Sequence, residues 1–156
     1  MTADLIARIA ELEAENERLK FNHLGMLTRQ GAVIENERNT YTEQRFVIGL
    51  DINYLKQMND KLGQAGVDSL MRQAFNLRNE DVKFKFNIKS GDEYGFVTRG
   101  NPDGFISHLT DNLTLHGLSA IMAWEPLTAT DDVMEVCERV MQKVYELKAQ
   151  RGIESR

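Results

Sequence analysis

The chain has 156 residues with a formal net charge of −5 at pH 7, 42% hydrophobic and 28% charged residues. This length suits one domain with a short extension, and it is sufficient to bury a hydrophobic core. The single cysteine, Cys137, excludes an internal disulfide and a cysteine-based zinc site, and the acidic balance argues against a large nucleic-acid surface. Because the sequence has no run of about 20 apolar residues and no secretory signal, we expect a cytoplasmic protein without a membrane or nucleic-acid partner.

Residues 1–26 predict a helix whose apolar side chains follow a heptad repeat. Position d holds Leu5, Leu12, Leu19 and Met26, and position a holds Ile9, Asn16 and His23. An asparagine at position a favours a parallel two-stranded register, because two buried amides pair in that arrangement. Opposite charges would also face each other across a parallel pair of helices: Arg8 with Glu13, and Glu15 with Lys20. We therefore predict a homodimer formed through this coiled coil; the alternative is an amphipathic helix packed on its own domain.

The next elements follow from hydrophobic periodicity. Residues 30–45 are polar with no sustained period, whereas residues 46–51 form an apolar run typical of a strand buried on both faces. A helix is expected at residues 53–62, where Gly63 stops it, and a second helix at residues 67–77. Alternation predicts strands at residues 82–88 and 94–98, joined by a tight turn at residues 90–93.

The C-terminal third predicts a short helix at residues 105–113, a strand at residues 118–124 and a last helix at residues 131–149. The side chains of Trp124, Tyr145 and Cys137 are expected in the core. The order is thus an N-terminal helix followed by β-α-α-β-β-α-β-α. Because a hairpin and longer crossovers mix, we predict an α/β (α+β) fold with a mainly antiparallel sheet flanked by helices.

Three carboxylates stand where two of the predicted strands end or turn. Asp51 ends a buried strand, and Asp92 and Glu93 lie on the turn of the hairpin. If the two strands are neighbours, these side chains converge at one end of the sheet. Mg²⁺ takes oxygen ligands, usually one or two carboxylates plus substrate phosphates, and can then support in-line attack by a hydroxyl. The alternative is that these acids are ordinary turn residues.

A longer motif begins at Asp51. Residues 51–68 read DINYLKQMNDKLGQAGVD and resemble D-x-D-x-F-K-x-x-N-D-x-x-G-H-x-x-G-D, a pattern of the GGDEF family of diguanylate cyclases. Six positions match without a gap: Asp51, Lys56, Asn59, Asp60, Gly63 and Asp68. Residues 90–94, SGDEY, resemble the motif that names the family, and residues 144–148, VYELK, resemble its A-L-Y-x-A-K helix. The resemblance runs from about residue 22 to residue 152.

This resemblance implies a palm-like domain at residues 27–156, preceded by the coiled coil of residues 1–26. It implies a dimeric enzyme that condenses two GTP molecules into cyclic di-GMP and pyrophosphate with Mg²⁺, or with Mn²⁺ in its place. The metal ligands would be Asp51, the Ile52 carbonyl, Asp92 and Glu93, and Asp92 would assist deprotonation of the 3′-hydroxyl. The expected catalytic residues are Asp92, Glu93 and Lys56.

The resemblance also implies how the substrate is held. Lys56 and Lys148 would bind the triphosphate. Asn59 and Asp68 would bind the guanine edge, because a carboxylate accepts from guanine N1 and N2 and adenine offers no such pair of donors.

Departures from the family pattern keep two other interpretations open. Ser90 replaces the first glycine of the naming motif, Val67 replaces a later glycine, and Arg151-Gly152 inverts the usual order. These changes favour a degenerate domain that binds GTP or a partner and signals by dimerisation. The compact domain also resembles the palm-domain cyclases of the minimal CRISPR polymerase group, which would make another cyclic nucleotide. The family's inhibitory R-x-x-D motif would fall on Asp81 and Phe84 and is absent.

Overall fold

The computed structural model describes residues 2–20, 24, 26–38, 43–89 and 92–153, without the side chains of residues 16–20 and 38. Its elements in chain order are α1 (Ala3–Lys20), α2 (Arg29–Arg38), β1 (Arg45–Ile52), α3 (Leu55–Phe75), β2 (Val82–Lys89), β3 (Glu93–Arg99), α4 (Pro102–Leu115), β4 (Ala120–Leu127) and α5 (Val133–Gln150). The sheet has the order β2-β3-β1-β4, and each neighbouring pair is antiparallel. The predicted fold class is confirmed.

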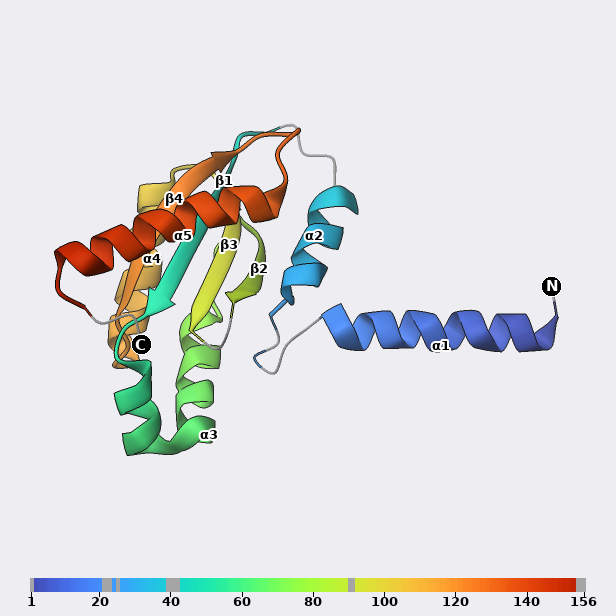
Figure 1. Cartoon of the computed structure of the whole chain (residues 1–156), viewed down its shortest axis with the longest axis horizontal. Coiled ribbons are helices and arrows are strands. Elements are labelled where there is room, and N and C mark those ends of the chain that lie inside the picture. The colour runs from blue at the N-terminus through green and yellow to red at the C-terminus, as the bar shows by residue number, and fades with distance from the viewer. Residues whose placement is uncertain (1, 21–23, 25, 39–42, 90–91, 154–156) are drawn as a thin grey trace.

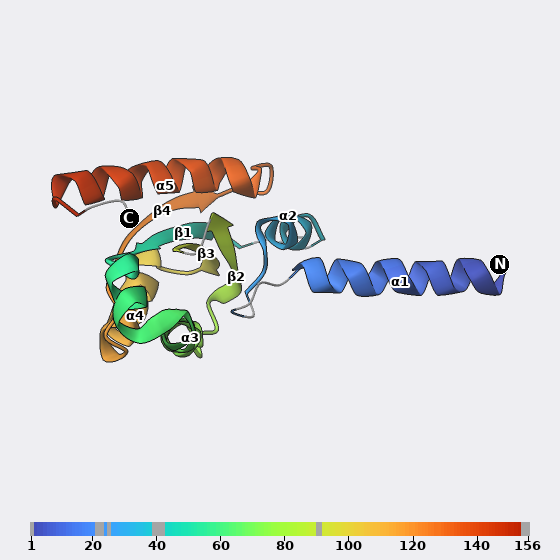
Figure 2. The same cartoon turned by 60° about the horizontal axis from the view of Figure 1, so that its bottom comes forward.

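Helices cover both faces of this sheet (Figures 1 and 2). Helices α2 and α5 lie over one face, and α3 and α4 lie over the other. Alternate residues of β1 serve the two cores: Val47 packs with the α5 side, whereas Ile48 and Leu50 pack with the α3 side. Because both faces are covered, β1 is apolar at nearly every position, which is why its sequence shows no alternation.

Helix α3 bends sharply at Gly63, which has φ 77° and ψ 160°. A residue with a Cβ is strained at such a positive φ, so glycine allows this turn. The predicted helix break at Gly63 is confirmed, and Figure 1 shows the two helical segments that it separates. Asn59 lies on the first segment and Asp68 on the second.

The N-terminal prediction is wrong at its C-terminal end. Helix α1 ends at Lys20, and Met26, which the heptad repeat places at position d, is 1% exposed in the domain core. Leu27 forms a parallel bridge with Phe86, so the chain before α2 lies along the free edge of β2. Leu24 is also buried in the core on the α3 side of the sheet. His23 lies outside the described residues.

Helix α2 was not predicted, because only Ala32 and part of Val33 pack into the core and no period emerges from so few contacts. Helix α4 begins earlier than expected, at Pro102, because the side chain of Asn101 caps it by accepting from the Asp103 amide at 3.0 Å. Strand β4 continues to Leu127 through Pro126, which an edge strand tolerates. Among the described residues, no helix is both long and apolar enough to cross a membrane; the cytoplasmic location stays a prediction.

The close approach of α5 to β1 at Gly49 gives a test of this packing. A Cβ added to Gly49 would lie 2.6 Å from Val140 Cγ1 and 3.0 Å from Met141 Sδ. Gly49→Ala should therefore lower the free energy of unfolding by about 1–3 kcal/mol, because overpacking forces α5 away from the sheet. Urea denaturation measures this change.

The matched control is Gly104→Ala in α4, where an added Cβ has no atom within 4 Å. This variant should be as stable as the wild type or more stable by up to about 1 kcal/mol, because alanine restricts the unfolded chain. Equal stability of Gly49→Ala and wild type would contradict the described α5 packing.

Candidate nucleotide and metal site

Antiparallel pairing of β1 with β3 brings the backbones of the three predicted acidic residues close together. Asp51 is the register partner of Glu93, and the Ile52 amide donates to the Asp92 carbonyl at 3.0 Å. All three acidic residues are buried, with 4–5% of their surface exposed. The condition set by the sequence, that the two strands be neighbours, is confirmed.

Lys148 of α5 supplies the positive charge at this end of the sheet. Its Nζ lies 3.2 Å from Asp51 Oδ2, and only 1% of its side chain is exposed. A buried ammonium is stable only when it is paired, so α5 and β1 are joined here by an ion pair within the core. Helix α5 is held in place by its apolar face, and its N-terminus is capped by Asp132, which accepts from the Met134 amide.

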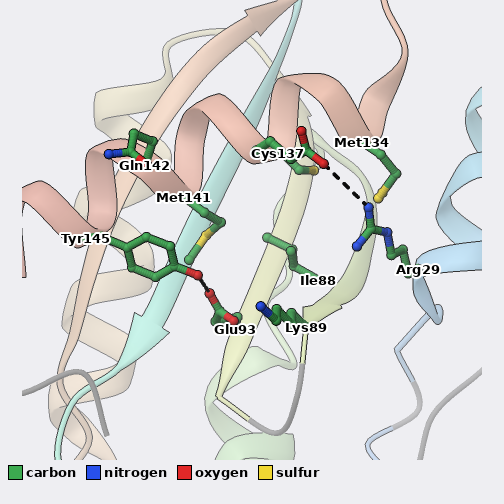
Figure 3. A pocket seen from close by; sticks show the side chains of 10 residues that line it. Arg29, Ile88, Lys89, Glu93, Met134, Cys137, Met141, Gln142 and Tyr145 are labelled. Carbon is green, nitrogen blue, oxygen red and sulfur yellow. Dashed lines mark hydrogen bonds and ion pairs between the residues drawn. The ribbon is translucent and has the colours of Figure 1, made fainter.

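Tyr145, which lies on α5 like Lys148, contacts Glu93 of β3. Its hydroxyl donates to Glu93 Oε1, as Figure 3 shows. Tyr145 and Lys148 are three residues apart on α5 and share a face. One helix therefore contacts the carboxylates of Asp51 and Glu93, whose backbones are register partners on β1 and β3. The prediction of Tyr145 as a core residue is wrong, since 37% of it is exposed. Its three-residue spacing from Lys148 indicates only that the two side chains share a helix face, and it does not reveal the contact with Glu93.

The electrostatics of Asp51 follow from its crowding. Burial raises the pKa of its carboxyl from 3.8 to about 6; Lys148 opposes this rise, and the charges of Asp92 and Glu93 add to it. Asp51 Oδ1 is buried and has no hydrogen-bond partner among the described residues. An unsatisfied carboxylate oxygen beside two further acids is a position where a cation would lower the energy of the site.

The three acidic side chains do not, however, converge as one cluster. No group of three His, Cys, Asp or Glu side chains within the described ranges could hold a metal ion. Glu93 accepts a hydrogen bond from Tyr145 on the α5 side. On the α3 side, burial raises the pKa of the Tyr94 hydroxyl most, and the nearby charge of Asp92 raises it further. Mg²⁺ at a nucleotide site needs only one or two carboxylates, the rest coming from phosphates and water. Asp51, with its open oxygen, and Asp92 fit that smaller ligand set.

The expected substrate residues lie around the start and the bend of α3. Lys56 is exposed in the first turn, and no described contact joins it to the acids. Asn59 is half-buried, and its Oδ1 has no hydrogen-bond partner in the described part of the chain. Asp68 is half-buried and accepts a hydrogen bond from Gln64 Nε2 at 3.0 Å. Burial raises the pKa of the Tyr94 hydroxyl, and the charges of Asp68 and Asp92 raise it further. Ser90 and Gly91 lie outside the described residues.

Burial tests the predictions that Cys137 and Trp124 lie in the core, whereas the role of the Ile52 carbonyl stays a prediction. Cys137 is a core residue as predicted, with 1% exposed, and burial raises the pKa of its thiol to about 12. Trp124 is half-buried and packs edge-on against Phe46 with ring centroids 5.3 Å apart. Ile52, the expected carbonyl ligand, is 2% exposed with its side chain in the α3-side core.

No protein-family model matches the chain, and no curated protein matches its sequence. Solved structures do match in fold. A microbial GGDEF domain described in an interaction with cyclic di-GMP superposes with a TM-score of 0.69 at 17% identity, over 85% of this chain and 94% of that one. The coiled coil and GGDEF domain of DgcB from Caulobacter crescentus, in complex with c-di-GMP, gives 0.64 at 17% identity over 95% of both chains.

A third match is the diguanylate cyclase SiaD from Pseudomonas aeruginosa in complex with its activator SiaC, with a TM-score of 0.66 at 16% identity over 96% of this chain and 69% of that one. The chain therefore has the fold of a GGDEF domain. At these identities, the likeness establishes the architecture alone.

The raised pKa of Asp51 predicts a pH dependence of stability. Because the folded state holds this proton more tightly than the unfolded state, the contribution to stability is full below pH 3.8 and is lost as pH rises through about 6. The free energy of unfolding of wild type relative to Asp51→Asn should thus fall between pH 4 and pH 7. Chemical denaturation at several pH values measures it; two parallel curves over this range would contradict the assignment.

Proposed function

We propose that this chain is a GGDEF-family diguanylate cyclase that condenses two GTP molecules into cyclic di-GMP and two pyrophosphates. The observation that carries the proposal is the junction of Asp51, Glu93 and Lys148, which combines buried acids with a buried lysine at one end of a GGDEF-type sheet. The unbroken match of residues 51–68 to the family motif supports it. The fold alone would support only the architecture.

In this proposal, Asp51 and Asp92 hold Mg²⁺ with the Ile52 carbonyl, and Glu93 is their neighbour. The metal, when bound, neutralises triphosphate charge and favours in-line attack. Asp92 accepts the proton of the 3′-hydroxyl. Lys148 would bind the triphosphate of GTP, and a phosphate would then replace Asp51 as the anionic partner of its ammonium group. Lys56 would bind the same triphosphate from the exposed start of α3.

Guanine is proposed to bind at the bend of α3. The unbonded Oδ1 of Asn59 and the carboxylate of Asp68 are both acceptors, as the donors at guanine N1 and N2 require. Adenine presents an acceptor at N1, so an adenine in this place would leave a carboxylate facing a lone pair. GTP is therefore the proposed substrate.

Ring closure needs two domains, because each 3′-hydroxyl attacks the α-phosphate of the other GTP. Helix α1 is the proposed tether. Its heptad residues Leu5, Ile9 and Leu12 remain 39–50% exposed, and Figure 1 shows α1 outside the layers of the domain. A second copy of α1 would cover this stripe, and tethering would replace a bimolecular encounter by a high effective concentration.

The metal assignment predicts that Asp51→Asn and Asp92→Asn each lower pyrophosphate release from GTP and Mg²⁺ by at least about a hundredfold, because each removes a charged ligand. Mn²⁺-dependent GTP binding, measured by calorimetry, should weaken in both. Asp111→Asn, an exposed acid of α4, is the charge-matched control and should keep full activity. Wild-type turnover in either test variant would refute the assignment.

The tether predicts a specific effect of charge on α1. Leu12→Asp places a carboxylate in the apolar stripe and should convert dimers into monomers at micromolar concentration, as measured by sedimentation. Ala14→Asp adds the same charge at heptad position f, away from the stripe, and should leave the dimer intact. A monomeric wild type, or equal dimerisation of both variants, would remove α1 as the tether.

One observation favours a second candidate function. The described residues contain no three-acid metal cluster, and Lys148 already neutralises Asp51. A degenerate domain that binds GTP and signals through its dimer would not need a three-acid metal cluster. Tight GTP binding with no pyrophosphate release in the wild type would select this alternative.

A further inference from the structure

A cavity of about 300 Å³ lies between the start of α2, the end of β2, the start of β3 and the face of α5 (Figure 3). Glu93 and Tyr145 line it, whereas Asp51, Lys148 and the α3 residues assigned to guanine do not. The cavity and the candidate nucleotide site therefore share one wall and otherwise use different side chains. Its volume is at the lower end of the range for small-molecule sites.

The floor of the cavity is apolar and rich in sulfur. Ile88 of β2 and three α5 residues, Met134, Cys137 and Met141, form it, and each of the four is at most 8% exposed. Thioether groups pack well against aromatic rings, and unbranched methionine side chains adapt to the shape of a ligand. This floor suits a flat apolar body of about a dozen non-hydrogen atoms.

The rim of the cavity offers two cations. Arg29 faces Glu138 at 3.9 Å, but both side chains are more than half exposed, so this ion pair is weak and an incoming carboxylate can compete for the guanidinium. Lys89 is exposed and has no ion-pair partner among the described side chains. The acid on the inner wall, Glu93, is already hydrogen-bonded by Tyr145. Glu138, the other acid of the lining, faces Arg29, so Lys89 is the one charged lining residue without a described partner, and an anion at the rim is better matched than a cation.

We propose that this cavity is a binding site for a small organic acid, with its aromatic body on the Met134–Met141 floor and its carboxylate at Arg29. Because Tyr145 and Glu93 form a wall of the cavity, a bound acid would contact the hydrogen bond that holds Glu93. An effect of this contact on turnover would rest on the proposed cyclase function. Binding itself can be measured without turnover, so the two can fail separately.

The test uses the full chain labelled with ¹³C at the methionine methyl groups and titrated with 1-naphthoate. The NMR signals of Met134 and Met141 should shift, while those of Met58 and Met71, on α3 across the sheet, should not. Arg29→Gln should raise the dissociation constant about fivefold, because it removes a charge-assisted contact. Arg139→Gln is the matched control: it removes an α5 arginine in a similar ion pair, 3.8 Å from Glu125, outside the cavity.

A cavity-filling variant and a competition with GTP test whether the acid binds in this cavity and apart from the nucleotide. Gln142→Trp fills the cavity from an exposed position of α5 and should abolish the shifts without disturbing the fold. Saturating GTP should leave the affinity for 1-naphthoate within about twofold when Mg²⁺ is present. The proposal is overturned if Met134 and Met141 do not respond, if both arginine variants bind equally, or if GTP displaces the acid, which would make the cavity part of the nucleotide site.

Discussion

The buried ion pair between Lys148 and Asp51 determines how the rest of this domain is arranged. Lys148 is 1% exposed, and its ammonium lies 3.2 Å from a carboxylate oxygen at the end of β1. Removing one partner of such a pair typically costs about 3–5 kcal/mol, because the other charge is left buried without compensation. The C-terminal part of α5 is thereby fixed to the end of β1, while contact with Gly49 fixes the middle of the helix.

This attachment also separates the site into two sides. On the α5 side, Lys148 and Tyr145 hold Asp51 and Glu93, whose backbones pair between β1 and β3. On the α3 side, Asp92 and Asp68 lie around the buried Tyr94. The sheet end therefore presents acids toward both helical layers. Under the proposed function, Asp51 and Asp92 would hold the metal, and nucleotide phosphates would supply the oxygens that these side chains do not.

Much of this arrangement could be predicted from the sequence, because strong local signals carry it. The apolar run ending at Asp51 and the helix break at Gly63 both describe local backbone, and each is confirmed. Of the turn expected at residues 90–93, Ser90 and Gly91 lie outside the described residues, and Glu93 already belongs to β3. The helix α2 could not be predicted, since one small buried residue, Ala32, leaves no period. Nor could the hydrogen bond from Tyr145 to Glu93, because it joins residues 52 positions apart and depends on how α5 lies across the sheet.

If this sheet end performs the proposed cyclisation of a guanine nucleotide, the identity of the product tests it most directly. Wild-type protein incubated with Mg²⁺ and either GTP or ATP should yield, by mass spectrometry, cyclic di-GMP from GTP and no cyclic dinucleotide from ATP. Omission of the metal should abolish the product. Recovery of unchanged GTP under conditions where GTP binding is saturated, or a cyclic product from ATP, would contradict the account.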